Sequence, residues 1–166
     1  MAIVDALLPE YDHETATTRK LLERVPDGKF DWKPHDKSMS LGDLAGHLAT
    51  MLSWGETTMN QSEFELSGDF TRPPMSNRAE LLAAFDKQAA ATRQTLAGKL
   101  DSEFMAPWTL KRQGKTMFTM PKIAVMRSFV LNHMIHHRGQ LSVYLRLNDV
   151  PVPSIYGPSA DEPSFG

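Results

Sequence analysis

A long apolar segment, residues 121–148, carries apolar side chains at the spacing of an α-helix. Leu131 and Ile135 lie on one side of the expected helix. A second stripe comprises Met126, Val130, His133, His137, Leu141 and Tyr144. A helix that is apolar on more than one side is buried at the centre of its fold or also faces a second subunit. We therefore expect this segment at the centre of a helical fold or at a subunit contact.

Three further segments show helical spacing, and two of them have recognisable starts. They cover residues 3–25, 40–59 and 77–97. Ser40 with Asp43, and Asn77 with Glu80, are typical N-cap pairs, and Gly98 ends the third segment. Four helical segments with long connections predict an all-α fold, a four-helix bundle.

The remaining stretches are expected to be irregular or nearly so. Residues 61–74 are polar and end in two prolines, which predicts a loop. Residues 108–119 resemble a small hairpin around Gly114, although an irregular excursion before the last helix fits them nearly as well. Residues 149–166 predict a coil tail, and residues 1–166 together predict a single domain.

Composition removes several classes of function. The net charge is -2 and the sequence has no basic run, so it does not predict a surface that binds nucleic acid or an anionic membrane. No apolar stretch approaches the roughly 20 residues of a membrane span. The first residues lack the pattern of a signal peptide. With 0 cysteines, disulfides and thiolate ligands are excluded, and we expect a cytoplasmic protein.

Two histidines in the last helical segment have the spacing of a metal-ligand pair. His133 and His137 lie one turn apart on the same face, so that their imidazoles can converge on one ion. Met134 stands where zinc proteases of that spacing carry a glutamate base. Two histidines hold a divalent ion weakly, so a third ligand is needed. His47, on the apolar stripe of the segment 40–59, is our candidate.

The same residues belong to a longer pattern that runs through the chain. Its parts are His133-x-x-His136-His137-Arg138-Gly139-Gln140, Pro151-x-Pro153-x-x-Tyr156-Gly157, Leu21-Leu22, Val25-Pro26, Trp32-x-Pro34 and Leu44-Ala45-x-His47. In this order they resemble the DinB-like family over nearly the whole chain. The resemblance implies an up-down-down-up four-helix bundle, often dimeric. It also implies a metal site on His47, His133 and His137, the set that the spacing favours.

The resemblance implies less about chemistry than about the metal. The wider superfamily includes thiol-dependent S-transferases and a maleylpyruvate isomerase. We therefore expect a metal-dependent enzyme that transfers a low-molecular-weight thiol or hydrolyses a small molecule. The alternative is a non-catalytic metal-binding stress protein or dimeric binding protein. A third reading is a metal-free bundle with histidines in its core.

Three imidazoles without a thiolate leave coordination positions for water or substrate, as in catalytic sites. Imidazole suits several transition metals, and we favour zinc or nickel. Iron oxygenases of the facial-triad type would need a carboxylate in place of one histidine.

Further residues near the pattern are candidates for contacts with substrate. Arg138 could hold a substrate carboxylate, or form an ion pair with an acid on a neighbouring helix. Tyr144 could reach the site or cap the core, Tyr156 could donate a proton from the tail, and Trp32 could anchor the loop or stack on a ligand. We expect Gln140 to orient a ligand or to bond across the bundle. His136 is expected to support the ligands or contact a second subunit; His13 and His35 are expected on the surface.

Overall fold

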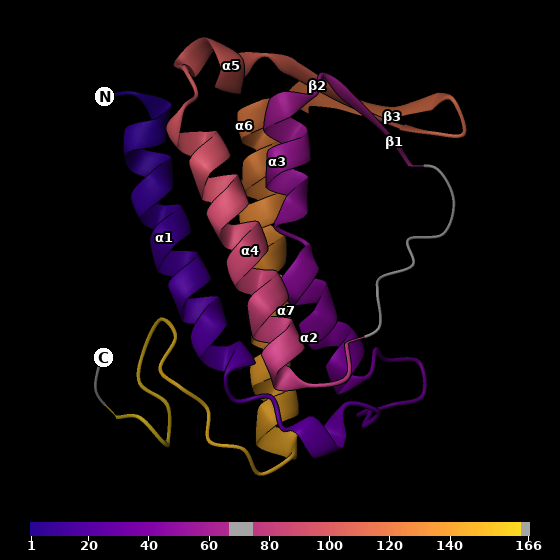
Figure 1. Ribbon diagram of the computed structural model, residues 1–166, viewed down its shortest axis with the longest axis vertical. Helices are drawn as coiled ribbons and strands as arrows, with labels where there is room; N and C mark the ends of the chain where they lie inside the picture. Colours follow the sequence, from indigo (N-terminus) through magenta and orange to yellow (C-terminus); the bar gives the residue numbers. More distant parts are fainter. Residues whose placement is uncertain (67–74, 164–166) are drawn as a thin grey trace.

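A computed structural model describes residues 1–66 and 75–163 of the chain, and four long helical segments run side by side in it (Figure 1). They are α1 (Ile3–Leu22); α2 (Leu41–Thr50) with α3 (Ser53–Asn60); α4 (Arg78–Ala97); and the continuous run of α6 (Lys122–Val125), η2 (Met126–Leu131) and α7 (Asn132–Leu147). The first and last segments run in one direction and the middle two in the opposite one, in agreement with the expected order. No helix among the described residues is long and apolar enough to cross a bilayer.

The expectation of an all-α fold needs a correction, because the chain also forms a small sheet. Its strands are β1 (Glu63–Leu66), β2 (Pro107–Arg112) and β3 (Lys115–Pro121), in the order β1-β2-β3. The antiparallel pair β2–β3 is the hairpin expected in 108–119, and Gly114 in its turn has a φ of 72°. β1 pairs in parallel with β2, although a loop was predicted there. The other part of that predicted loop, 67–74, lies outside the described residues.

Two helix starts are fixed by the side chains that the sequence indicated. The Ser40 hydroxyl accepts a hydrogen bond from the Asp43 amide at 3.0 Å, and the Asp43 carboxylate accepts one from the Ser40 amide. The Asn77 side chain accepts one from the Glu80 amide at 2.9 Å. These caps satisfy amides that have no partner within their own helix. The first of them sets where α2 begins, and therefore where His47 lies.

The segment 40–59 is two helices rather than one. The helix breaks at Met51 and Leu52, and the Leu52 carbonyl accepts a hydrogen bond of 2.7 Å from the Thr92 hydroxyl of α4. α3 and α4 lie in close contact here, since a Cβ on Gly55 would lie 2.5 Å from the Thr92 methyl carbon. The Leu52 carbonyl also accepts a bond from the Gly55 amide at 2.9 Å, so the Thr92 hydroxyl is a second donor that ties α4 to the break.

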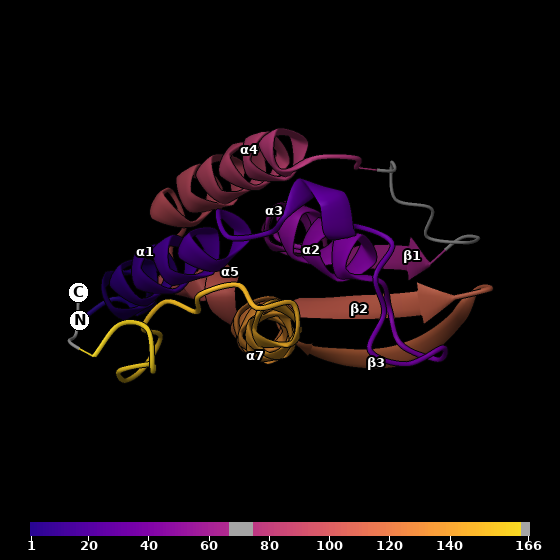
Figure 2. The same cartoon turned by 90° about the horizontal axis from the view of Figure 1, so that it is seen from below.

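The tail after α7 has no helix or strand between residues 149 and 163, as expected, but it is firmly attached. Figure 2 shows it folding back beside α7 towards α1, on the side of α7 away from the sheet. Asp161 pairs with Arg146 of α7, and Glu162 pairs with Arg24 at 2.8 Å. These ion pairs hold a segment that its proline-rich sequence alone would leave extended.

Candidate metal centre

His47 lies on α2, in the part of that helix that packs against α7. Its helix neighbours Leu44 and Leu48 are almost fully buried, while His47 itself is half-buried. The imidazole therefore lies at the edge of the core rather than inside it. This position gives the ring both a fixed direction and access to solvent.

His133 and His137 meet His47 from α7. Their Nε2 atoms are 2.8 Å apart, and Nε2 of His133 lies 3.4 Å from Nε2 of His47. One ligand atom from each of the three side chains lies within 4.8 Å of the others. The structure thus brings together the three residues that the sequence predicted as ligands.

The geometry and chemistry of the three rings suit a divalent transition metal ion. Nitrogens held at ~2.1 Å by one tetrahedral ion lie about 3.4 Å apart, and at a right angle about 3.0 Å apart. The separations of 3.4 and 2.8 Å lie close to those values. Within the described part of the chain, no carboxylate joins this group. The set would leave at least one coordination position to water or substrate.

Gln140 supports the arrangement from one turn further along α7. Its Oε1 lies 2.7 Å from Nδ1 of His137 and accepts a hydrogen bond from it. A proton on Nδ1 leaves the lone pair on Nε2, the atom that faces the other two histidines. Gln140 therefore selects the tautomer of His137 that can bind metal, which is one of its two expected roles.

A sequence model of the DinB family matches residues 4–164. The chain belongs to the DinB family. Relatives of this chain include the uncharacterized protein YrdA of Bacillus subtilis (strain 168), which is 26% identical over 159 residues that cover 96% of this chain and 91% of YrdA.

Solved DinB-like structures share the fold. A DinB-like protein from Bacillus cereus ATCC 10987 superposes with a TM-score of 0.73 at 21% identity, covering 93% of this chain and 98% of that one. The DinB-like protein YjoA from Bacillus subtilis superposes with a TM-score of 0.68 at 17% identity, covering 88% and 95%. At these identities the likeness shows the fold of the DinB family and no particular reaction.

Tyr144 and Trp32 lie on the same side of α7 as the histidines. Tyr144 follows His137 by two turns, and its ring meets that of Trp32 edge to face, with centroids 5.4 Å apart. The Tyr144 hydroxyl donates to the carbonyl of Met39 at 3.3 Å. Tyr144 thus ties the 30–40 connection to α7, and Trp32 packs on it as an anchor.

Arg138 points towards α1 and not towards the histidines, and it is almost completely buried. Its guanidinium pairs with Glu14 of α1 at 2.6 Å, and the two side chains are 1% and 7% exposed. Of the two roles expected for Arg138, the structure therefore shows the ion pair with a neighbouring helix. Glu14 was not among the predicted site residues. The sequence could have indicated it, because this acid lies on the same helical stripe as Tyr11 and Thr18.

Tyr156 joins this buried pair rather than the histidines. Its hydroxyl donates to the Glu14 carboxylate at 2.7 Å, and its ring centroid lies 4.9 Å from Cζ of Arg138. Partial burial, followed by the hydrogen bond to Glu14, raises the pKa of the Tyr156 hydroxyl. The structure does not bring Tyr156 or Arg138 to the three histidines.

The other histidines take the places expected of residues that are not ligands. His136 is exposed on α7, with its ring centroid 4.9 Å from that of His137. His13 and His35 are exposed, and Nδ1 of His35 accepts a hydrogen bond from the Lys37 amide. His136 therefore provides a matched control for substitution of His137.

Proposed function

We propose that this chain is a metal-dependent enzyme of the DinB family that acts on a small molecule. The convergence of the His47, His133 and His137 nitrogens carries the proposal. Three neutral nitrogen ligands and half-burial favour a site that substrate can reach over a closed structural site. Zinc or nickel is the proposed ion, because imidazole ligands in this number suit both.

The proposed reaction is transfer of a low-molecular-weight thiol to an electrophile, with hydrolysis of a small substrate as the second possibility. An ion held by the three histidines would lower the pKa of a coordinated thiol or water. In the transfer, the thiol sulfur bonds to the electrophilic carbon, the leaving group departs with its electron pair, and the thiol proton passes to water. The described part of the centre includes no carboxylate base, which thiol transfer does not need.

Trp32 and Tyr144 are the proposed contacts for the body of the substrate. Tyr144 lies about 10 Å along the helix axis from His137, on the same face. The edge-to-face contact with Trp32 gives a rigid aromatic wall at that distance. Arg138 and Tyr156 have no part in this proposal. Arg138 forms an ion pair with Glu14 and Tyr156 donates a hydrogen bond to it, and both contacts lie away from the histidines.

The proposal also covers the oligomeric state and the cellular location of the protein. We propose a homodimer in the cytoplasm, in line with the resemblance and with the exposed apolar residues Val143 and Leu147 on α7. A non-catalytic role is the second candidate, because the ion would join α2 to α7 and so stabilise the bundle.

The test is a turnover assay on protein loaded with zinc or nickel. Cysteine with a chloronitrobenzene electrophile reports thiol transfer, and p-nitrophenyl acetate reports hydrolysis. We expect turnover in the wild type and in His136→Ala, and none in His137→Ala or after chelation. No turnover with any pair, together with a large loss of melting temperature on chelation, would favour the non-catalytic role instead.

A further inference from the structure

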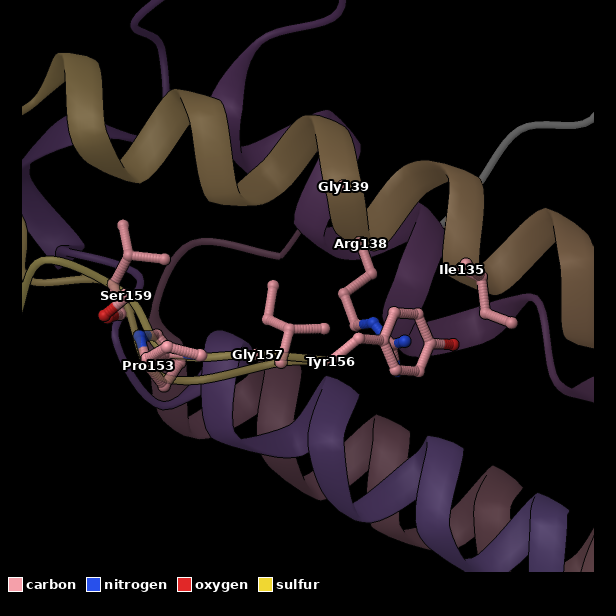
Figure 3. A pocket seen from close by; sticks show the side chains of 10 residues that line it. Ile135, Arg138, Gly139, Pro153, Tyr156, Gly157 and Ser159 are labelled. Carbon is pink, nitrogen blue, oxygen red and sulfur yellow. The ribbon is translucent and has the colours of Figure 1, made fainter. Parts of the chain in front are cut away.

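A pocket lies between α7 and the tail (Figure 3). It has a volume of about 410 Å³ and is lined by Ile135, Arg138 and Gly139 of α7 and by tail residues that include Val152 and Tyr156. At 100° per residue, Ile135 and Gly139 lie roughly half a turn around the helix from His137. The pocket is therefore separate from the candidate metal centre.

Arg138 is the one charged residue among those that line this pocket, and one of its nitrogens has no partner. Nη1 donates to the backbone carbonyl of Glu14 at 3.1 Å and pairs with its carboxylate. Nη2 is buried and makes no hydrogen bond within the described structure. A buried N–H without an acceptor is unfavourable, so an acceptor supplied by a ligand would be stabilising.

Tyr156 covers the guanidinium of Arg138. Its ring lies 4.9 Å from Cζ of Arg138, and the residue is 58% exposed. The hydroxyl bond to Glu14 holds the ring in place. In Figure 3 the Tyr156 ring lies beside the guanidinium, so a ligand would reach Nη2 only after this ring turns away, which breaks the bond to Glu14 and the contact with Arg138.

The charges around Arg138 decide which ligand fits. Glu14 already neutralises Arg138, so a second carboxylate would leave a net negative charge among apolar walls. An uncharged carbonyl oxygen accepts from Nη2 without that cost. The walls of Ile135, Val152 and Pro153 suit an apolar body, and the volume is in the range of small-molecule sites. We propose that this pocket binds an uncharged, mainly apolar small molecule through a carbonyl oxygen that accepts from Arg138.

The test uses benzamide as the neutral probe and benzoate as its charged counterpart of similar shape. Each is titrated into the full-length protein while the backbone amide signals are followed by NMR. We expect benzamide to shift the amides of Ile135, Gly139 and Gly157 saturably, and benzoate to bind at least about tenfold more weakly. Equal or tighter binding of benzoate would overturn the choice of a neutral acceptor. No saturable shift with benzamide would overturn the site.

Gly139→Leu tests the location without touching the ion pair. A Cβ on Gly139 meets no atom within 4 Å, so the new side chain can extend into the pocket without strain in the helix. We expect at least about a tenfold loss of benzamide affinity, with the melting temperature maintained. Met117→Leu, exposed on β3 and outside the pocket lining, is the control and should bind as the wild type does. Unchanged binding in Gly139→Leu would place the probe elsewhere and contradict the inference.

Tyr156→Phe tests the opening step. The variant keeps the ring but loses the hydrogen bond to Glu14, so its displacement costs less. We expect benzamide to bind more tightly than to the wild type. Unchanged or weaker binding would show that the hydroxyl bond to Glu14 does not limit access to Nη2, and would overturn this part of the inference.

Discussion

Nε2 of His47 lies 3.4 Å from Nε2 of His133, although 86 positions separate the two residues in the chain. The contact joins α2 to α7 across the bundle. Two imidazole nitrogens this close can share a proton or bind one metal ion, and His137 adds a third nitrogen next to them.

Replacement of Gln140 by Ala should weaken metal binding without loss of the fold. Without the acceptor at Nδ1, His137 no longer keeps the tautomer that directs its lone pair at the ion. We expect a loss of affinity of about 10- to 100-fold. A competition titration against a chromophoric chelator measures it, with Val143→Ala as the control on the same helix. Equal affinities in the two variants would mean that the hydrogen bond has no effect on the site.

Metal binding should raise the melting temperature, because the ion would join α2 to α7. At a free concentration of 100 times the dissociation constant, the gain is about 2.7 kcal/mol. For a chain of this size that corresponds to a shift of roughly 5–10 °C. Differential scanning calorimetry with and without zinc measures it. His47→Ala should show no shift, and an equal shift in that variant would indicate binding elsewhere.

Breaking the ion pair between Glu14 and Arg138 should strongly destabilise the protein. Arg138→Met leaves the Glu14 carboxylate buried without its partner, which costs about 3–5 kcal/mol of unfolding free energy. Urea denaturation measures the loss. The double variant Glu14→Leu with Arg138→Met removes both charges and should recover most of it. A double variant as unstable as the single one would show that lost packing, and not an uncompensated charge, dominates.

Acid should release the tail before it unfolds the bundle. The hydrogen bond from Arg146 lowers the pKa of Asp161, and the bond from the Ser154 amide lowers that of Glu162. Because the folded-state pKa values lie below the unfolded ones, the stability that these groups contribute is complete above their ordinary pKa values. It is lost as the pH falls through the lowered values.

Hydrogen exchange of the Val152 and Ser154 amides, both of which donate to these carboxylates, measures this release. Protection should be constant from neutral pH down to about 5 and fall below about 4. Asp161→Asn with Glu162→Gln should lack the acid step. Loss of protection at the same pH in core amides of α7 would instead indicate global unfolding.

Features that depend on nearby residues could be predicted from the sequence. The caps at Ser40 and Asn77 are local, and the helical spacing and the resemblance together indicated His47, His133 and His137. β1 could not be predicted, because its four residues gain their partners only from β2, more than 40 positions later. The break at Met51 and Leu52 likewise lies at a contact between distant segments, where the Thr92 hydroxyl of α4 donates to the Leu52 carbonyl.

The partner of Arg138 shows the same limit. The sequence offered several acids for an ion pair, and only the packing of α1 against α7 selects Glu14. Tyr156 also donates a hydrogen bond to Glu14 and therefore lies away from the histidines. The spacing of residues along the chain could not indicate this contact.

The central claim is that His47, His133 and His137 hold one metal ion, and elemental analysis tests it most directly. The protein is purified without a histidine tag, and its metal content is measured before and after dialysis against a chelator. We predict about one zinc or nickel ion per chain, lost in His47→Ala and retained in His136→Ala. A wild-type protein that holds no metal and takes up none on addition, or a His47→Ala variant with unchanged content, would contradict the account.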